Sequence, residues 1–434
     1  MPDDNTFRNE APLDPREKGV PGNAGVVPLG EVASRGWALL NEDLPLPAAV
    51  IKAGALKHNS AWMREFLETA GVRIAPHGKT TMSPALFDLQ LDDGAWAITL
   101  STPHQLHVAR SFGFNRILLA NQLVGRSAIG WVVEQLNADS AFEFYCLVDS
   151  VENLRALAEV SRQNSLRRPI KVLVEIGFPG GRTGCRTVDA ALEVAREAQN
   201  FKDVIALCGV EGFEGIIRGP TEPETVARVS AFLDQMVDLA EACGRERLFA
   251  DGLVIFTAGG SAFFDIVADK LGAIRLDQDH IVVLRSGCYL THDAVMYTYL
   301  FDQLKIRNPG LSQRQGDLQA ALEVWAYVQS IPEPGRIIIA LGKRDISFDQ
   351  MPVPVAWYRP GGGWTGPRPA PADHKMVGLY DQHGILRAPE TSPWRVGDMV
   401  GFGISHPCLT FDKWRVLHLV DDGYKIIGSV RTYF

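Results

Sequence analysis

One lysine occupies a position at which lysine side chains can do covalent chemistry. Lys79 lies in the segment RIAPHGKTTMSP (73–84), three residues beyond a short apolar run at 72–76. The amine of a lysine at the end of a buried strand can form a Schiff base with a carbonyl substrate or with pyridoxal phosphate. It can equally be a surface charge, and its position alone leaves both interpretations open.

Two later apolar runs end in segments that could bind a phosphate. The first, TAGGSAFFD (257–265), places Gly259, Gly260 and Ser261 just before a predicted helix start, and the second is LRSGCYL (284–290). Backbone N–H groups of such a loop, together with a serine hydroxyl, form a cradle for phosphate oxygens. An ordinary turn explains the Gly-Gly-Ser sequence as well, so this prediction depends mainly on its location.

A third chemical motif lies near the C-terminus, in GISHPCLTFDKW (403–414). His406 and Cys408 are separated by Pro407 alone. Alternate residues of an extended chain point to the same side, so an imidazole and a thiolate could reach one metal ion. That ligand pair suits zinc. A turn with a buried cysteine is the alternative, because a pair is fewer ligands than zinc sites normally have.

The elements that position these residues alternate between apolar runs and amphipathic segments from about 50 to 300. Such alternation predicts a parallel sheet covered by helices. A (β/α)8 barrel fits both the number of runs and the length, and functional residues of that fold follow the strand ends. A doubly wound open sheet is the alternative, but its glycine-rich fingerprint is absent. The eight predicted strands are 72–76, 96–100, 116–120, 142–148, 170–176, 206–213, 253–258 and 280–284.

The pattern changes after about residue 305, where short apolar runs are separated by Gly, Pro and Asp. This pattern predicts an antiparallel β domain. The segment PAAVIKAGAL (47–56) could contribute a strand to it. We therefore predict an N-terminal arm at 1–45, a barrel at 46–304 and a β domain at 305–434. The arm has no periodicity and is either disordered or packed on the body.

Composition excludes several classes of protein. The 434 residues are 46% hydrophobic and carry a formal net charge of −8, without a Lys/Arg run. A nucleic-acid or anionic-membrane partner would need a basic surface. No apolar run approaches a membrane span, and the polar N-terminal segment does not resemble a signal peptide, so we expect a cytoplasmic protein. Scattered cysteines without a CxxC motif are expected to be reduced thiols: Cys146, Cys185, Cys208, Cys243, Cys288 and Cys408.

These segments together resemble the D-serine dehydratase / D-threonine aldolase family of pyridoxal-phosphate enzymes. Members of this family have the alanine-racemase-like fold, known as fold type III. The resemblance covers the chain from about residue 47 to the C-terminus. The motifs that carry it are Pro76-His77-Gly78-Lys79-Thr80, Gly181-Arg182-Thr183-Gly184, Gly259-Gly260-Ser261, Arg285-Ser286-Gly287-Cys288-Tyr289, Asp381-Gln382-His383-Gly384, Gly397-Asp398 and Ser405-His406-Pro407-Cys408-Leu409-Thr410.

The resemblance implies a role for each motif. Lys79 would hold pyridoxal 5'-phosphate covalently, and Arg285 would face the pyridine nitrogen. The phosphate would be held, largely through backbone N–H groups, by Gly260, Ser261, Gly287 and Cys288. The cofactor-binding set would be completed by His77, Arg182, Gly259 and Tyr289. His406 and Cys408 match the metal pair, and the cysteine resembles the zinc-dependent dehydratase branch, whereas the aldolase branch has an aspartate there. By their position in the sequence alone, His383 and Asp345 are candidates for further ligands.

The implied activity is the conversion of D-serine, or a related D-β-hydroxy amino acid, to a 2-oxo acid and ammonia. A metal-dependent aldolase and a non-catalytic pyridoxal-phosphate-binding protein are the alternatives, and a racemase needs no metal. The family also implies a homodimer. Two departures bear on the substrate: Phe213 replaces a tyrosine that is usual in the family, and His104 replaces a common glutamate.

Overall fold

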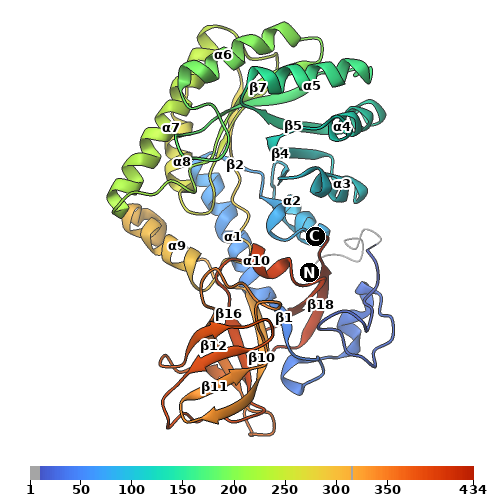
Figure 1. Cartoon of the computed structure of the whole chain (residues 1–434), viewed down its shortest axis with the longest axis vertical. Coiled ribbons are helices and arrows are strands. Elements are labelled where there is room, and N and C mark those ends of the chain that lie inside the picture. Colours follow the sequence, from blue (N-terminus) through green and yellow to red (C-terminus); the bar gives the residue numbers. More distant parts are fainter. Residues whose placement is uncertain (1–9, 314–315) are drawn as a thin grey trace. The chain divides into compact units, whose positions relative to one another are not determined.

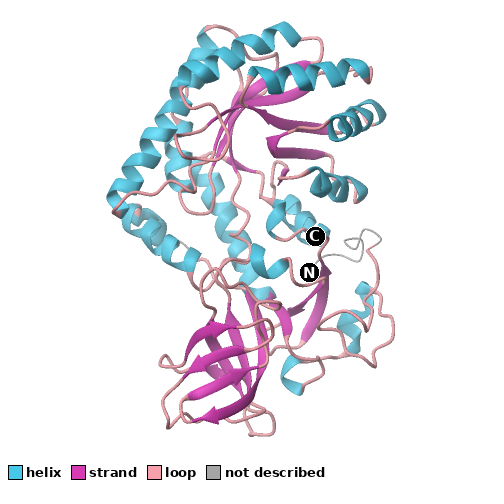
Figure 2. Ribbon diagram, in the orientation of Figure 1, coloured by secondary structure: helices cyan, strands magenta, loops and turns pink. Residues whose placement is uncertain are grey.

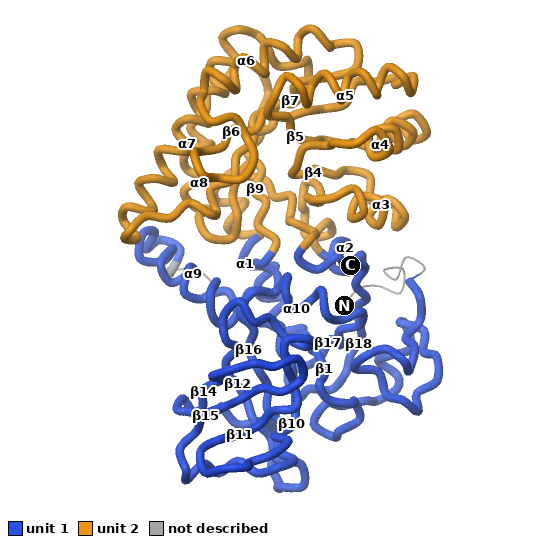
Figure 3. The backbone as a smooth tube through the Cα atoms, in the orientation of Figure 1, with its two compact units in different colours: residues 1–63, 80–89, 288–434 blue, residues 64–79, 90–287 orange. Residues whose placement is uncertain are grey.

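The computed structural model describes residues 10–313 and 316–434. It contains two compact units (Figure 3). We call residues 64–79 and 90–287 the barrel unit, and residues 1–63, 80–89 and 288–434 the sheet unit. The sheet unit draws on three separate segments, whereas the predicted domains are continuous in sequence. The predicted domain boundaries stay a prediction.

The barrel unit is built on a sheet of eight parallel strands, as predicted. The sheet order is β2-β9-β8-β7-β6-β5-β4-β3, and a parallel bridge between His77 and Thr99 links its two end strands. The strands are β2 (Arg73–Ile74), β3 (Ile98–Leu100), β4 (Arg116–Gln122), β5 (Glu143–Val148), β6 (Ile170–Ile176), β7 (Ile205–Gly212), β8 (Val254–Ala258) and β9 (His280–Leu284).

Helices alternate with these strands and flank them in the ribbon (Figure 2). Several begin at a residue whose hydroxyl accepts a hydrogen bond from the N–H three residues later, as Thr102, Ser150, Thr187 and Thr221 do. Each such cap stabilises its helix by about 1 kcal/mol. The helices within this unit are α3 (Pro103–Ser111), α4 (Arg126–Ala138), α5 (Val151–Gln163), α6 (Val188–Ala198), η4 (Gln199–Phe201), α7 (Glu222–Arg245) and α8 (Phe264–Gly272).

The interior of the barrel unit is packed with side chains from successive strands, as in a barrel core. The buried members of this cluster are Ala75, Ala97, Leu118, Tyr145, Leu147, Leu173, Cys208, Ile255 and Val283. Close approach of β7 and β8 depends on Gly209, because a Cβ there would lie 1.9 Å from the carbonyl oxygen of Ile255. The core therefore fixes the strand ends from which the candidate residues extend.

The sheet unit contains mostly antiparallel strands (Figure 1), as predicted for the C-terminal part of the chain. Its main path runs β13-β12-β16-β10-β1-β17-β18, and β11, β14 and β15 extend it from β10. The strands are β1 (Ala48–Lys52), β10 (Leu322–Glu333), β11 (Arg336–Ile339), β12 (Val353–Tyr358), β13 (Arg368–Pro369), β14 (Lys375–Leu379), β15 (Gly384–Arg387), β16 (Met399–Gly403), β17 (Val416–Val420) and β18 (Ile426–Arg431).

Helical segments also connect the elements of the chain. Helices α1 (Ala53–Ala70) and α2 (Pro84–Asp92) and the turn η3 (Gly78–Thr80) each include residues assigned to both units, whereas the others belong to the sheet unit. The latter are η1 (Leu29–Arg35), η2 (Leu39–Asn41), α9 (Met296–Arg307), η5 (Pro309–Gln313) and α10 (Cys408–Phe411). No helix in the described ranges is both long and apolar enough to cross a membrane.

Strand β1 confirms the prediction that the segment at 47–56 contributes to the second sheet. It pairs antiparallel with β10 and parallel with β17, so that Val50 is opposite both Glu323 and His418. The run of Ala, Val and Ile in β1 is buried, as expected for a central strand covered on both faces.

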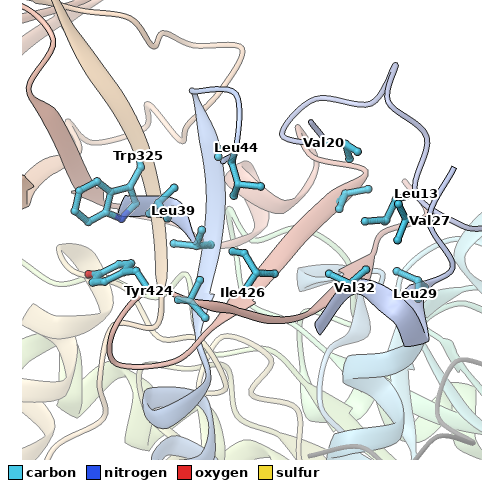
Figure 4. Packing of buried hydrophobic residues seen from close by; sticks show 14 of the residues in the cluster. Leu13, Val20, Val27, Leu29, Val32, Leu39, Leu44, Trp325, Tyr424 and Ile426 are labelled. Carbon is cyan, nitrogen blue, oxygen red and sulfur yellow. The ribbon is translucent and has the colours of Figure 1, made fainter. Parts of the chain in front are cut away.

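The described part of the N-terminal arm, from residue 10 onward, packs against strands of the sheet unit (Figure 4). Its apolar side chains are widely spaced in sequence but belong to one buried cluster with residues of the sheet, Trp325 and Tyr424 among them. Of the two alternatives for the arm, the structure therefore shows packing on the body for the part that it describes, while residues 1–9 lie outside the described residues. The buried arm residues are Leu13, Val20, Val27, Leu29, Val32, Leu39 and Leu44.

Candidate active site and metal centre

Lys79 lies in the short turn η3, just beyond β2. The chain before it is fixed by its neighbours, because the N–H of Ala75 donates to Leu284 O at 2.8 Å and the N–H of Thr99 donates to Pro76 O at 2.9 Å. The lysine side chain is partly buried. Lys79 therefore extends from a rigid strand end, which is where a positioned amine is expected in this architecture.

His77 lies beside this lysine and is held neutral. Burial lowers the pKa of its imidazole well below the usual value, and the charges of Lys79 and Arg285 lower it further. Its Nε2 lies 3.3 Å from the hydroxyl of Ser101. Its buried Nδ1 has no hydrogen-bond partner among the described residues. A neutral ring with an unpaired nitrogen is suited to stack on, or hydrogen-bond to, a bound aromatic cofactor.

The Gly-Gly-Ser turn after β8 is organised by a glutamate that the sequence analysis did not identify. Glu214 is fully buried, and its carboxylate accepts hydrogen bonds from Gly259 N at 3.0 Å and from Gly260 N at 2.9 Å. These two N–H groups are thus engaged within the protein. In this structure the N–H groups of Gly259 and Gly260 therefore shape the turn, and their predicted contact with a cofactor stays a prediction.

The remaining donors of the predicted cradle fit a phosphate. Within the described part of the chain, the N–H groups of Ser261 and Gly287 have no acceptor. The loops that carry them are joined, since the hydroxyl of Ser286 donates to Gly260 O at 3.1 Å and Arg285 N donates to Gly259 O at 3.1 Å. Oriented N–H groups without an acceptor in a fixed loop are suited to bind an anion.

Arg285, at the end of β9, is anchored on three sides. Its guanidinium forms an ion pair with Glu211 and donates to the Thr257 hydroxyl at 3.1 Å and to Gly212 O at 3.0 Å. Burial raises the pKa of Glu211 to about 8, although the charge of Arg285 lowers it. The arginine is thus fixed at the ends of β7, β8 and β9, and its predicted contact with a pyridine nitrogen stays a prediction.

Arg182 and Tyr289 complete the predicted cofactor set. The Arg182 guanidinium lies 4.4 Å from the centre of the Phe213 ring, a cation–π contact. The same ring borders the turn after β8, because a Cβ on Gly260 would lie 3.1 Å from it. Tyr289 is buried. The roles of both predicted residues stay predictions.

The metal pair proves to be part of a larger cluster within the sheet unit. Ligand atoms of His406, Cys408 and Cys288 all lie within 4.8 Å of one another. The chain at the pair is not extended, because Pro407 has helical dihedral angles and α10 begins at Cys408. The two side chains converge through a helical turn instead. Cys288 was predicted to contact the phosphate mainly through its backbone, and its thiol was not among the predicted ligands.

Hydrogen bonds and charges orient this cluster. Asp349 Oδ2 lies 3.7 Å from His406 Nδ1, and the Ser405 hydroxyl donates to Asp349 Oδ1 at 2.5 Å. The Asp349 carboxylate is thus a charged neighbour of the imidazole, and carboxylates are common partners of metal-bound histidines. Hydrogen bonds from Cys288 and His406 lower the pKa of the Cys408 thiol well below its usual value, although burial opposes them.

The two further ligand candidates lie elsewhere. The Asp345 carboxylate accepts hydrogen bonds from Lys18 Nζ at 3.0 Å and from Gly342 N at 3.0 Å. His383 is exposed. Neither residue belongs to the cluster of three, so the structure does not support them as ligands. The expectation for them was based on position in the sequence alone.

This fold and these residues define an alanine-racemase-like protein. Residues 51–250 match the family model described as "Alanine racemase, N-terminal domain", and residues 321–420 match the "Putative serine dehydratase domain". The chain thus combines a segment similar to the alanine racemase N-terminal domain with a segment similar to a serine dehydratase domain.

Curated and solved relatives agree with this assignment. The D-threo-3-hydroxyaspartate dehydratase of Delftia sp. (strain HT23) is 27% identical over 56% of this chain and 67% of its own. The 3-hydroxy-D-aspartate aldolase of Paracoccus denitrificans (strain Pd 1222) is 22% identical over 79% of this chain and 80% of its own.

Among solved structures, a D-threonine aldolase from Filomicrobium marinum has a TM-score of 0.72 at 21% identity, covering 92% of this chain and 97% of its own. A cysteine-to-alanine mutant of D-threo-3-hydroxyaspartate dehydratase, described as the metal-free form, has a TM-score of 0.69 at 23% identity, covering 92% of this chain and 99% of its own. The relatives are lyases, and the chain is a pyridoxal-phosphate-dependent lyase of D-amino acids.

Proposed function

We infer that the protein is a zinc-dependent dehydratase that converts D-serine to pyruvate and ammonia. The observation that carries this proposal is the grouping of the His406 imidazole with the Cys408 thiol, which makes them a possible metal pair. Thr80, the residue after Lys79, has its hydroxyl oxygen 3.5 Å from the Cys408 sulfur. As the resemblance implies, the proposal assigns the Lys79 amine a role at Cα and the metal pair a role at Cβ.

The chain supplies the groups that hold the cofactor and move the α-proton. Lys79 would attach the cofactor, and Ser261 and Gly287 would donate their N–H groups to its phosphate. Bound pyridoxal phosphate supplies an electron sink for the charge that develops at Cα. The Lys79 amine would take the α-proton as general base. Neutral His77 adds no competing positive charge near this amine.

The metal pair would assist the loss of the β-hydroxyl group. His406 and Cys408 would hold the ion, and Asp349 would orient the imidazole. The ion supplies Lewis acidity, which hydroxide departure requires because hydroxide is a poor leaving group. A thiolate favours zinc over the harder ions that oxygen ligands select. Cys408 thus supports a dehydratase of the zinc-dependent branch that the sequence resembles.

The relatives supply the main competing activity. Two of them are aldolases, and an aldolase would use the same lysine and metal to cleave the bond between Cα and Cβ. A relative named as a dehydratase acts on 3-hydroxyaspartate, whose additional carboxylate needs a cationic partner. The substrate panel must therefore include D-serine, D-threonine and D-threo-3-hydroxyaspartate. A homodimer, small-molecule D-amino acid substrates and a cytoplasmic location complete the proposal.

Product analysis is the test. The purified enzyme with pyridoxal phosphate and zinc should form pyruvate and ammonia from D-serine and leave L-serine unchanged. Lys79→Ala should abolish turnover, whereas Lys202→Ala, at an exposed lysine, should not. Borohydride should fix the cofactor to the peptide that contains Lys79. Glycine and an aldehyde as the main products of D-threonine would make the enzyme an aldolase, and absence of any product would favour a non-catalytic binding protein.

A further inference from the structure

We propose that Cys288 is a third protein ligand of the metal, so that the ion is held by two thiolates and one imidazole. This inference rests on the proposed function for what the ion does, but not for how the ion is bound. It changes the site from the pair His406 and Cys408 into a Cys2His set. Such a set leaves one tetrahedral position open for a substrate hydroxyl.

The distances between the three ligand atoms are close to those expected when all three bind one metal ion. With a zinc–sulfur bond of about 2.3 Å, two ligand atoms of one ion can lie at most about 4.6 Å apart. The ligand atoms of Cys288, His406 and Cys408 lie within 4.8 Å of one another. Shifts of a few tenths of an ångström to about 1 Å would therefore bring all three to tetrahedral distances. These three are the sole such group found in the described ranges.

The surroundings of Cys288 also suit a ligand. Its side chain is 5% exposed and lies next to the Thr80 hydroxyl, whose oxygen is 3.9 Å from the sulfur. The Cys408 thiol donates to the same hydroxyl oxygen at 3.5 Å, so Thr80 contacts the sulfurs of both cysteines. Hydroxyl donors around thiolates stabilise the negative charge that metal binding requires.

A third ligand has consequences for metal choice. Two thiolates neutralise the charge of a divalent ion, and they favour zinc over magnesium and manganese more strongly than one thiolate does. The ion should also resist chelators better than an ion held by two protein ligands. Because Cys288 would bind through its side chain, its backbone N–H stays available for the phosphate contact predicted for it.

Cobalt substitution tests the ligand count without any assay of turnover. The holoenzyme is stripped of metal, loaded with Co²⁺ and compared with Cys288→Ser, Cys288→Ala and Cys243→Ala. Cys243 is a buried cysteine on α7 and serves as the matched control. We expect thiolate-to-cobalt absorption to fall by about half in both Cys288 variants and to stay unchanged in the control. Zinc affinity, measured by chelator competition, should fall by at least about tenfold. Even the loss of a residue that only hydrogen-bonds to a metal ligand typically lowers affinity by about that factor.

X-ray absorption of the zinc-loaded wild type counts sulfur ligands even if a variant does not fold. Two sulfurs would support the proposal, and one sulfur would overturn it. Unchanged cobalt absorption and unchanged zinc affinity in a folded Cys288→Ala would overturn it as well. A wild type with two sulfur ligands but no dehydratase products would contradict the proposed function and leave this inference intact.

Discussion

Replacing Glu214 with alanine should weaken cofactor binding, although this side chain is predicted not to touch the cofactor. Glu214 accepts hydrogen bonds from Gly259 N and Gly260 N at 3.0 and 2.9 Å in a fully buried setting. Without the carboxylate, both N–H groups lose their acceptor. The turn that presents Ser261 to a phosphate would then lose the contacts that define its shape.

The magnitude follows from these two bonds. A hydrogen bond to a charged group contributes about 1.5–3 kcal/mol, so two contribute at most about 3–6 kcal/mol. Water entry and relaxation should recover part of this loss, and we expect a net destabilisation of about 3 kcal/mol. If about half of this destabilisation appears as weaker cofactor binding, the affinity for pyridoxal phosphate falls by about tenfold, since about 1.4 kcal/mol corresponds to a factor of ten.

Two measurements check this prediction. Urea unfolding followed by fluorescence reports stability, and titration of stripped enzyme with pyridoxal phosphate, followed by absorbance, reports affinity. Glu193→Ala removes an exposed glutamate from α6 and should leave both quantities unchanged. Glu214→Gln should give an intermediate loss, because the amide keeps one acceptor but places an NH₂ group against the second N–H. Wild-type stability and affinity in Glu214→Ala would refute the role of the carboxylate.

Two further predictions concern metal removal and pH. Dialysis against a strong chelator should abolish turnover while the cofactor stays bound, and zinc should restore it; full activity in a verified metal-free sample would exclude a catalytic metal. Burial lowers the pKa of His418 from 6.5 to about 4, and its Nε2 lies 2.9 Å from Gly19 O. The folded state therefore favours the neutral imidazole. The free energy of unfolding should be highest above pH 6.5 and should fall by roughly 3 kcal/mol as the pH decreases towards 4. His418→Gln should flatten that part of the pH dependence, and an unchanged profile would contradict this reasoning.

Most of the fold could be predicted because each strand carries its own local pattern. The eight buried strands are short apolar runs with polar segments between them, and β1 is recognisable as a strand before its partners are known. The N-terminal arm could not be predicted in the same way. Leu13, Val20 and Val27 are separated by turn residues and show no period. Their burial depends on tertiary packing against β-strands that follow much later in the chain.

The parts of the candidate site that could be predicted are those whose residues lie close together in the sequence. Lys79 and the pair His406 and Cys408 stand in compact motifs. The thiol of Cys288 was missed because it is distant in sequence from that pair, and scattered cysteines otherwise indicate reduced core thiols. Glu214 was missed for a different reason. Its function is to satisfy backbone N–H groups, and no local sequence pattern reveals which buried donors need an acceptor.

Strand β1 makes completion of the sheet unit depend on the order in which the chain is synthesised. Its two neighbours, β10 and β17, leave the ribosome only after the whole barrel unit has been made. During that interval, β1 exposes two unpaired edges of an apolar strand, which is the kind of surface that aggregates or recruits chaperones. Closing so long a loop is also slow. Truncation before β17 would therefore leave β1 without one partner permanently, so loss of C-terminal residues should damage the first strand of the protein as well as the last.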